Sequence, residues 1–221
     1  MFPFQAFIDL LYPPLCTVCK KTLVQGEEYI CSFCLAEFPF SDAVFTKELP
    51  FSEGCKYPEA IHTLFYYNKF SKYSGLILAV KYASRQKLGL YLGRMLGEKM
   101  GTGIFDGIIP VPLHPKKEKK RGFNQSYQIA LGIASVLHTD IWNNVLVRQI
   151  NNPTQTGKNS MERAQNVANV FALSNGDGAI GKHVLLVDDV ITTGATLCSC
   201  IEALSPVEGL RVSIGCLGQT E

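Results

Sequence analysis

Residues 184–196, VLLVDDVITTGAT, constrain the fold of this chain more than any other segment. The apolar run that opens the segment predicts a buried strand. Two adjacent carboxylates, Asp188 and Asp189, stand at its end, and a Thr-Thr-Gly-Ala-Thr turn leads into a predicted helix over residues 195–204. A strand that passes through a short turn into a helix is the repeating unit of parallel α/β sheets.

The same alternation continues through most of the chain. Strands are predicted over residues 61–67, 107–113, 145–147, 170–173 and 210–217. Helices are predicted over residues 71–83, 87–100 and 124–137. This order predicts an α/β fold in which helices cover both faces of a parallel sheet. Ligands of such sheets bind beyond the carboxyl ends of the strands, which draws attention to the loops after residues 113 and 187.

The segment after the predicted strand at 183–187 suits a phosphorylated sugar. Amide N–H groups of the turn and of the helix N-terminus favour an anion, and Gly194 lets the backbone approach it closely. Carboxylates accept hydrogen bonds from vicinal hydroxyls and help to hold Mg²⁺. Helix capping would explain one Asp and one Thr, but not an acid pair followed by three hydroxyl residues around a glycine.

This segment resembles, along its whole length, the motif that binds 5-phosphoribosyl-1-pyrophosphate (PRPP) in type I phosphoribosyltransferases. The resemblance implies that Asp188 and Asp189 bind the ribose 2′ and 3′ hydroxyls, with Mg²⁺ accompanying PRPP. It also implies that the turn cradles the 5′-phosphate, through Thr192, Thr193, Gly194, Ala195 and Thr196.

A basic stretch in residues 112–126 is the second candidate for anion binding. Its cations are Lys116, Lys117, Lys119, Lys120 and Arg121. Three interpretations are open: a solvated loop, a contact with nucleic-acid backbone, or a site for the diphosphate of PRPP. The position after a parallel strand, opposite the phosphate turn, favours the diphosphate. Arg121 is the first choice because Gly122 permits a tight turn, followed by Lys116 and Lys117, whereas His114 is expected to be structural.

Residues 112–125 resemble the pattern of the ComF family, whose members join a double zinc ribbon to a phosphoribosyltransferase-like domain and are linked to DNA uptake in competence. Residues 152–166 agree with that pattern at Gln155, Arg163 and Asn166. The resemblance implies that Gln155 and Arg163 contact the ligand, in a loop that can close over it. Without the resemblance, this stretch reads as an ordinary exposed loop.

Two Cys-x-x-Cys pairs lie near the N-terminus: Cys16, Cys19, Cys31 and Cys34. Four thiolates at this spacing suit a tetrahedral Zn²⁺ ion, and they leave no open position for catalysis, so the ion is expected to be structural. Two disulfides or a redox pair are the alternatives. We expect Phe33, Phe38 and Phe40 to form the small core of this module. Three further cysteines are expected to pack as small hydrophobes: Cys198, Cys200 and Cys216.

Composition places the whole chain among globular proteins. It has 221 residues, 47% of them hydrophobic, and a net charge of +2, which gives no global attraction to nucleic acid. The N-terminal segment has no basic leading region, and no apolar run is long enough to span a membrane, so a cytoplasmic location is expected. We expect two domains, residues 1–57 with an N-terminal helix and the zinc ribbon, and residues 58–221 with the phosphoribosyltransferase-like fold.

Three functional hypotheses follow. The first is an enzyme in which Asp188, Asp189 and Arg121 act in phosphoribosyl transfer to an unidentified acceptor. The second is a module that binds PRPP or a nucleotide without transfer and acts with competence proteins. The third is a protein that binds single-stranded DNA through the ribbon and the basic stretch.

Overall fold

The computed structural model describes residues 12–41, 44–45, 58–82, 85–101, 105–149 and 170–220. Several predictions lie outside these residues: the N-terminal helix before residue 12, and the roles of Gln155, Arg163 and Asn166. Within the described residues, no helix is both long and apolar enough to cross a bilayer.

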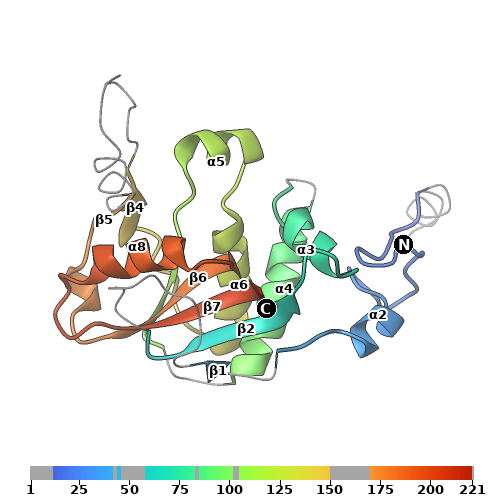
Figure 1. Cartoon of the computed structure of the whole chain (residues 1–221), viewed down its shortest axis with the longest axis horizontal. Helices are drawn as coiled ribbons and strands as arrows, with labels where there is room; N and C mark the ends of the chain where they lie inside the picture. Colours follow the sequence, from blue (N-terminus) through green and yellow to red (C-terminus); the bar gives the residue numbers. More distant parts are fainter. Residues whose placement is uncertain are drawn as a thin grey trace, which may run out of the picture.

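The main sheet has five strands in the order β1-β2-β7-β6-β3 (Figure 1). Their bounds are Val44–Phe45 (β1), Ile61–Tyr67 (β2), Gly107–Pro110 (β3), His183–Ile191 (β6) and Arg211–Thr220 (β7). Neighbours from β2 to β3 are parallel, and β1 is antiparallel to β2. The predicted parallel sheet is therefore confirmed.

Strand β6 runs further than the sequence predicts. It continues past the acid pair to Ile191 because pairing with β7 resumes beyond Asp189, with Asp188 opposite Cys216 and Val190 opposite Gly218. The two short predicted strands exist as β4 (Leu146–Arg148) and β5 (Phe171–Leu173), but they pair with each other in a separate antiparallel sheet.

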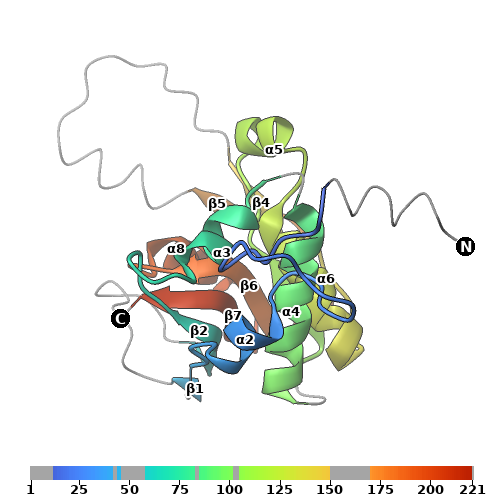
Figure 2. The same cartoon turned by 90° about the vertical axis from the view of Figure 1, so that its right-hand side faces the viewer.

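Helices cover both faces of the sheet. Leu185 and Val187 of β6 belong to the core cluster beneath α4 (Gln86–Met100) and α6 (Gln125–Leu137). Val184 and Leu186 belong to the cluster beneath α8 (Ala195–Leu204), as expected when successive side chains of a strand point to opposite faces. Figure 2 shows α4 and α6 on one side of β6 and β7, with α8 on the other.

A close helix crossing fixes α4 against α6. A Cβ atom on Gly93 would lie 2.2 Å from the carbonyl oxygen of Ile129, a distance that no real contact reaches. Glycine at this position lets the two backbones touch, so α6 is held firmly at the sheet. The start of α6 carries Ser126, which belongs to the site described below.

The basic stretch is a helix and not the loop that the sequence suggests. Helix α5 covers Pro115–Arg121 and projects from the body of the protein (Figure 1). The ring of His114 accepts a hydrogen bond from the Lys116 N–H at 3.1 Å, Pro115 occupies the first helical position, and Gly122 ends the helix with φ of 82°. His114 therefore has the structural role that was predicted.

The N-terminal module packs directly on the α/β body. The Tyr73 hydroxyl before α3 (Ser74–Ala79) donates to the Cys34 carbonyl of the module's short helix α2 (Ser32–Ala36). Three residues of the module, Cys16, Ile30 and Phe38, share one hydrophobic cluster with Leu76 and Leu88. Phe38 is buried as predicted, whereas Phe33 is 69% exposed and Phe40 is 43% exposed. The prediction of a core role was wrong for Phe33, because it lies on the outward side of the five-residue helix α2. For Phe40 it holds only in part, because the ring contacts Phe38 at 4.8 Å but stays exposed.

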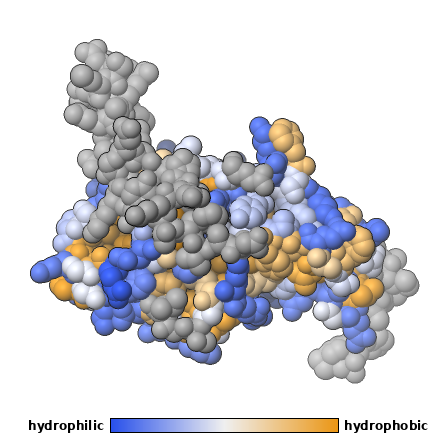
Figure 3. Space-filling model, turned by 60° about the horizontal axis from the view of Figure 1, so that its bottom comes forward, coloured by the Kyte–Doolittle hydropathy of each residue, from blue (hydrophilic) through white to orange (hydrophobic). Residues whose placement is uncertain are grey.

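On the face shown in Figure 3, hydrophilic and hydrophobic residues are interspersed. This agrees with a net charge near zero and directs the search for a site to local groups of side chains.

Candidate functional site

The acid pair lies near the carboxyl end of β6 and is almost completely buried. Asp188 is 8% exposed and Asp189 is 6% exposed. Oδ1 of Asp188 accepts hydrogen bonds from the Ser126 hydroxyl and from the Asp189 N–H, both at 2.9 Å. Oδ2 of Asp189 lies 3.1 Å from Nζ of Lys81. The acid pair is therefore held by contacts with α6 and with the segment after α3.

Burial and the neighbouring charge of Asp189 raise the pKa of Asp188 to about 7. The Asp189 N–H and the Ser126 hydroxyl favour the charged form and oppose this shift. Near neutral pH, Asp188 is therefore poised between its neutral and charged forms. A ligand that donates hydrogen bonds or brings a cation would shift it to the carboxylate.

Oδ2 of Asp189 can accept a further hydrogen bond. Among the described side chains, this atom is the one buried oxygen or nitrogen without a hydrogen bond, although the Lys81 ammonium lies close to it. The Lys81 ammonium, 3.1 Å away, pairs with this oxygen, and a carboxylate oxygen has a second lone pair that can accept a further hydrogen bond. A sugar hydroxyl is a suitable donor.

Four cations face the acid pair across one open pocket. Lys117 and Arg121 come from α5, Lys81 from the segment after α3, and Arg148 from β4. Lys117 and Arg121 are four residues apart and share one face of their helix. Arg121 donates to Gln125, which fixes its orientation. This arrangement places strong anion-binding groups beside hydroxyl-binding groups.

The turn between β6 and α8 borders the same pocket. Gly194 has φ of 70° and directs the chain into α8. The first turn of a helix leaves amide N–H groups without intrahelical acceptors, which suits a phosphate. Thr196 lines the pocket, while the side chains of Thr192 and Thr193 are exposed at its border.

The structure brings together only part of the predicted set. Five of the predicted side chains line the pocket: Asp188, Asp189, Lys117, Arg121 and Thr196. Lys116, Thr192, Thr193, Gly194 and Ala195 are not among the lining residues. Sequence reasoning gave no site role to Lys81, Ser126 or Arg148. Ser126 falls within the basic stretch that was singled out, whereas Lys81 and Arg148 are single cations outside any recognised motif.

The four N-terminal cysteines form a second site. Their sulfur atoms lie within 4.8 Å of one another, and those of Cys19 and Cys31 are 3.7 Å apart. Tetrahedral Zn²⁺ with Zn–S distances of about 2.3 Å needs sulfur atoms about 3.8 Å apart. Burial disfavours the Cys16 thiolate, but N–H donors of Cys31, Cys19 and Val18 outweigh it and lower the pKa of Cys16 to about 6. The cluster therefore fits structural zinc.

The cysteines near the C-terminus behave differently. Cys200 and Cys216 are buried free thiols, and burial raises the pKa of each well above its usual range. This confirms their role as small core residues. Cys198 is 3% exposed and packs in the same core cluster, as predicted, and it is also disulfide-bonded.

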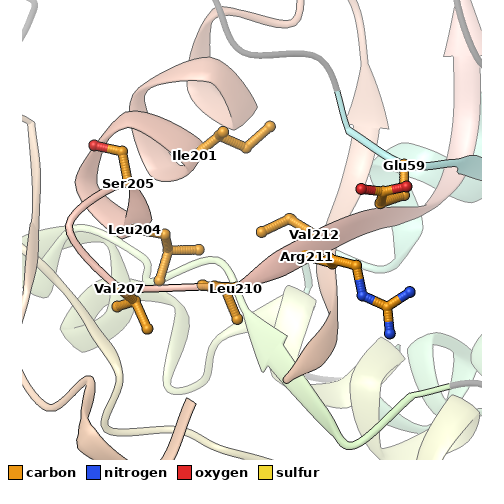
Figure 4. Close-up of a pocket in the computed structure, with 8 residues that line it drawn as sticks. All are labelled: Glu59, Ile201, Leu204, Ser205, Val207, Leu210, Arg211 and Val212. Atoms are coloured by element: carbon orange, nitrogen blue, oxygen red, sulfur yellow. The ribbon is translucent and has the colours of Figure 1, made fainter. Parts of the chain in front are cut away.

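A pocket at the opposite end of the sheet has a different character. It lies where β7 begins and is lined mainly by apolar side chains such as Ile201, Leu204 and Val212, with Glu59 and Arg211 at its border (Figure 4). It lies at the amino end of a parallel strand, where ligands of α/β sheets rarely bind. The acid-pair pocket is therefore the better candidate for the functional site.

Comparisons with known proteins match both parts of the chain. The double zinc ribbon domain family matches residues 7–45, and the phosphoribosyl transferase domain family matches residues 123–219. DNA utilization protein YhgH of Escherichia coli K12 is 27% identical over 228 residues, which cover 96% of this chain and 99% of that protein. The two domain matches, this relative and the two relatives described next support assignment to the ComF family. The fold of this chain is that of a type I phosphoribosyltransferase-like domain with an N-terminal double zinc ribbon.

Two other relatives match this chain over shorter stretches. Competence protein F of Haemophilus influenzae is 38% identical over 93 residues, 42% of this chain and 41% of its own. Competence protein ComFC of Bacillus subtilis is 36% identical over 90 residues, 41% of this chain and 34% of its own. A solved glutamine PRPP amidotransferase from B. subtilis covers 63% of this chain and 30% of its own, at 18% identity and a TM-score of 0.45. That likeness carries no functional argument.

Proposed function

We propose that this chain binds PRPP together with Mg²⁺. The observation that carries the proposal is the buried acid pair, which lines one pocket together with Lys117 and Arg121. The acid pair would accept hydrogen bonds from the ribose 2′ and 3′ hydroxyls. The α8 turn with Thr196 would hold the 5′-phosphate, and the α5 cations would hold the diphosphate.

Magnesium fits the same pocket. Mg²⁺ prefers carboxylate oxygens and substrate phosphates, and it usually retains several waters. Asp188 and Asp189 are the residues that would hold it. When bound, the ion would supply positive charge next to the diphosphate.

Transfer of the phosphoribosyl group is the reaction that this arrangement supports. The bond between C1 of ribose and the diphosphate oxygen would break with its electron pair passing to diphosphate, and an acceptor lone pair would form the new bond to C1. The acceptor proton would leave to solvent. Arg121 and Lys117 would stabilise the growing charge on diphosphate, as donors fixed in place beforehand do in other enzymes.

Calorimetry with PRPP and Mg²⁺ tests the binding proposal. We expect the unaltered chain to bind PRPP and Asp188→Asn combined with Asp189→Asn to lose binding at least 100-fold, because both hydroxyl acceptors would be altered. Asp140→Asn, a change at an exposed acid outside the pocket, is the matched control and should bind normally. Equal binding by all three proteins would exclude the proposed site. Release of diphosphate in the presence of candidate bases separates transfer from binding alone.

A second candidate function is the binding of single-stranded DNA. The relatives above include proteins named for DNA utilization and competence. A groove of about 550 Å³ next to the acid-pair pocket is lined by Leu78 and Tyr82 and by cations that include Lys117 and Lys120. Tyr82 is 64% exposed, and an aromatic ring beside cations suits base stacking and backbone contacts.

Salt-dependent binding tests this second function. Binding of a labelled single-stranded oligonucleotide should weaken with rising salt, and should fall further in Lys120→Glu combined with Tyr82→Ala. Binding that is indifferent to both changes would exclude the groove. The location in the cytoplasm and an association with competence proteins remain predictions.

A further inference from the structure

One short segment of the chain contacts both the zinc ribbon and the acid pair. We define it as the α3 segment, residues 73–82, which contains α3 and ends just after Lys81. Leu76, Ile77 and Val80 within it are at most 2% exposed and share one core cluster with the ribbon residues Cys16 and Cys34. The buried side of the segment is therefore part of the same hydrophobic core as the ribbon.

The first residue of the α3 segment is tied to a zinc-site cysteine. The Tyr73 hydroxyl donates to the carbonyl oxygens of Cys34 and Glu37, each at 2.9 Å. Tyr73 is 4% exposed, and its ring lies edge-on to Phe38 of the ribbon at 5.3 Å. These contacts depend on the backbone conformation of the ribbon, which the cysteine cluster holds in place.

A second contact follows shortly after the segment. Nη1 of Arg85 lies 3.5 Å from Oγ1 of Thr17, a buried residue between Cys16 and Cys19. The backbone carbonyl of Thr17 also accepts a hydrogen bond from Nζ of Lys20 at 2.7 Å. Contacts with the ribbon therefore occur on both sides of Lys81 in the sequence.

Lys81 connects the α3 segment to the functional pocket. Its ammonium lies 3.1 Å from Oδ2 of Asp189, and its side chain remains 31% exposed at the pocket. Two adjacent buried carboxylates would repel an anionic ligand. A cation held beside them offsets that repulsion, and it is within reach of the same pocket as Lys117 and Arg121.

We infer that the zinc ribbon positions Lys81 through the α3 segment, so that zinc loading and PRPP binding reinforce each other. This inference rests on the proposed binding of PRPP. Lys81 is a positioning residue here, because it adjusts the charge at Asp189. Thermodynamic reciprocity requires that PRPP tighten the ribbon's hold on zinc by the same factor by which zinc tightens PRPP binding. Couplings of this kind typically reach about 5- to 150-fold.

A double-mutant cycle tests the coupling from the ribbon through Tyr73 to Lys81 without removal of the zinc. Four zinc-loaded proteins are compared by calorimetry with PRPP and Mg²⁺: the unaltered chain, Tyr73→Phe, Lys81→Met, and the two changes together. Tyr73→Phe removes one buried hydroxyl that lies away from the pocket. We expect it to weaken PRPP binding about 5-fold and Lys81→Met about 20-fold, with the double variant no weaker than Lys81→Met.

Tyr91→Phe is the matched control. Tyr91 lies on α4 and contacts the ribbon at Tyr29, with ring centroids 5.3 Å apart, but it lies outside the α3 segment. Its loss should leave PRPP binding unchanged. An equal effect of Tyr91→Phe and Tyr73→Phe would overturn the inference, because it would show a general response to ribbon changes.

The reciprocal measurement uses zinc transfer to a zinc-selective chromogenic chelator, with and without saturating PRPP and Mg²⁺. PRPP should slow or weaken transfer from the unaltered chain and have no effect on Lys81→Met. If PRPP binds normally to Tyr73→Phe and leaves zinc transfer unchanged, the inference alone fails. If PRPP does not bind to the unaltered chain, the proposed function fails and the inference fails with it.

Discussion

The zinc ribbon and the acid-pair pocket concentrate polar groups in opposite ways. In the ribbon, four sulfur atoms within 4.8 Å of one another satisfy one tetrahedral ion, and all four come from 19 consecutive residues. In the pocket, side chains between Lys81 and Thr196 come from several elements and leave Oδ2 of Asp189 without a hydrogen bond. A closed set of ligands stabilises a fold, whereas an open set with one unfilled acceptor is suited to bind something else.

Removing a zinc ligand should have the largest effect of all. In Cys34→Ser the tetrahedral set loses one thiolate, and structural zinc contributes about 10 kcal/mol or more to folding in small zinc domains. We expect zinc content to fall from one ion per chain toward none and the ribbon to become sensitive to protease. Metal analysis and limited proteolysis measure both. Cys200→Ala, a change at a buried cysteine outside the cluster, should keep its zinc. Full zinc retention by Cys34→Ser would contradict the assignment of the four cysteines as zinc ligands.

Loss of a pocket cation should be the next largest effect. Arg121→Gln should weaken PRPP binding about 30-fold, because a charge-assisted contact with diphosphate is lost. Ribose 5-phosphate lacks the diphosphate and should bind the variant almost normally. Lys116→Gln is the matched control, since Lys116 is on the same helix but does not line the pocket. A similar loss for Lys116 and Arg121 would mean that α5 acts through its total charge.

The pH dependence of binding should be about tenfold per unit. Burial and Asp189 raise the pKa of Asp188 to about 7, so below that pH the acid is increasingly neutral. If the ligand requires the carboxylate, PRPP affinity should fall about tenfold for each unit below pH 7, and proton release should accompany binding near pH 7. Calorimetry in buffers of different ionisation enthalpy detects that proton. A flat profile between pH 6 and 8 would show that Asp188 does not titrate in binding.

The smallest effect should be on stability. The pKa of Asp188 in the folded chain exceeds its ordinary value of 3.8, so the folded state binds this proton more tightly than the unfolded state does. The stability of the unaltered chain therefore decreases as pH rises from about 4 to about 7. Asp188→Asn carries no charge and should be about 1 kcal/mol more stable at pH 8, with the difference shrinking toward pH 4. Denaturant unfolding at pH 8 and pH 5 measures this difference, and a variant that is less stable at pH 8 would contradict it.

The part of the fold that sequence predicts best is the part set by local pattern. Strand β2 and helix α8 have the predicted bounds, because their apolar periodicity and their turn residues agree. Helix α5 was missed because its stability comes from capping by His114, Pro115 and Gly122, and not from an apolar stripe. Strand β6 continues through the acid pair because pairing with β7 outweighs the preference of Asp for turns.

The candidate site likewise contains residues that the sequence predicts and residues that it does not. Asp188, Asp189 and Thr196 belong to one motif, and so they are visible in the sequence. Lys81 and Arg148 reach the pocket only because packing places α3 and β4 beside it. Neither residue lies in a sequence motif that predicts a site. Tertiary contacts, such as the one between Ser126 and Asp188, complete the pocket.

The most direct test of the account compares ribose 5-phosphate with 2-deoxyribose 5-phosphate as ligands of the unaltered chain and of Asp189→Asn. These ligands differ by one hydroxyl, and rejection of the deoxy compound reports a hydrogen bond to the acid pair. We predict that the unaltered chain prefers ribose 5-phosphate about tenfold and that Asp189→Asn binds both weakly and equally. An unaltered chain without preference, or a variant that keeps the full preference, would contradict the claim that the buried acids hold the sugar.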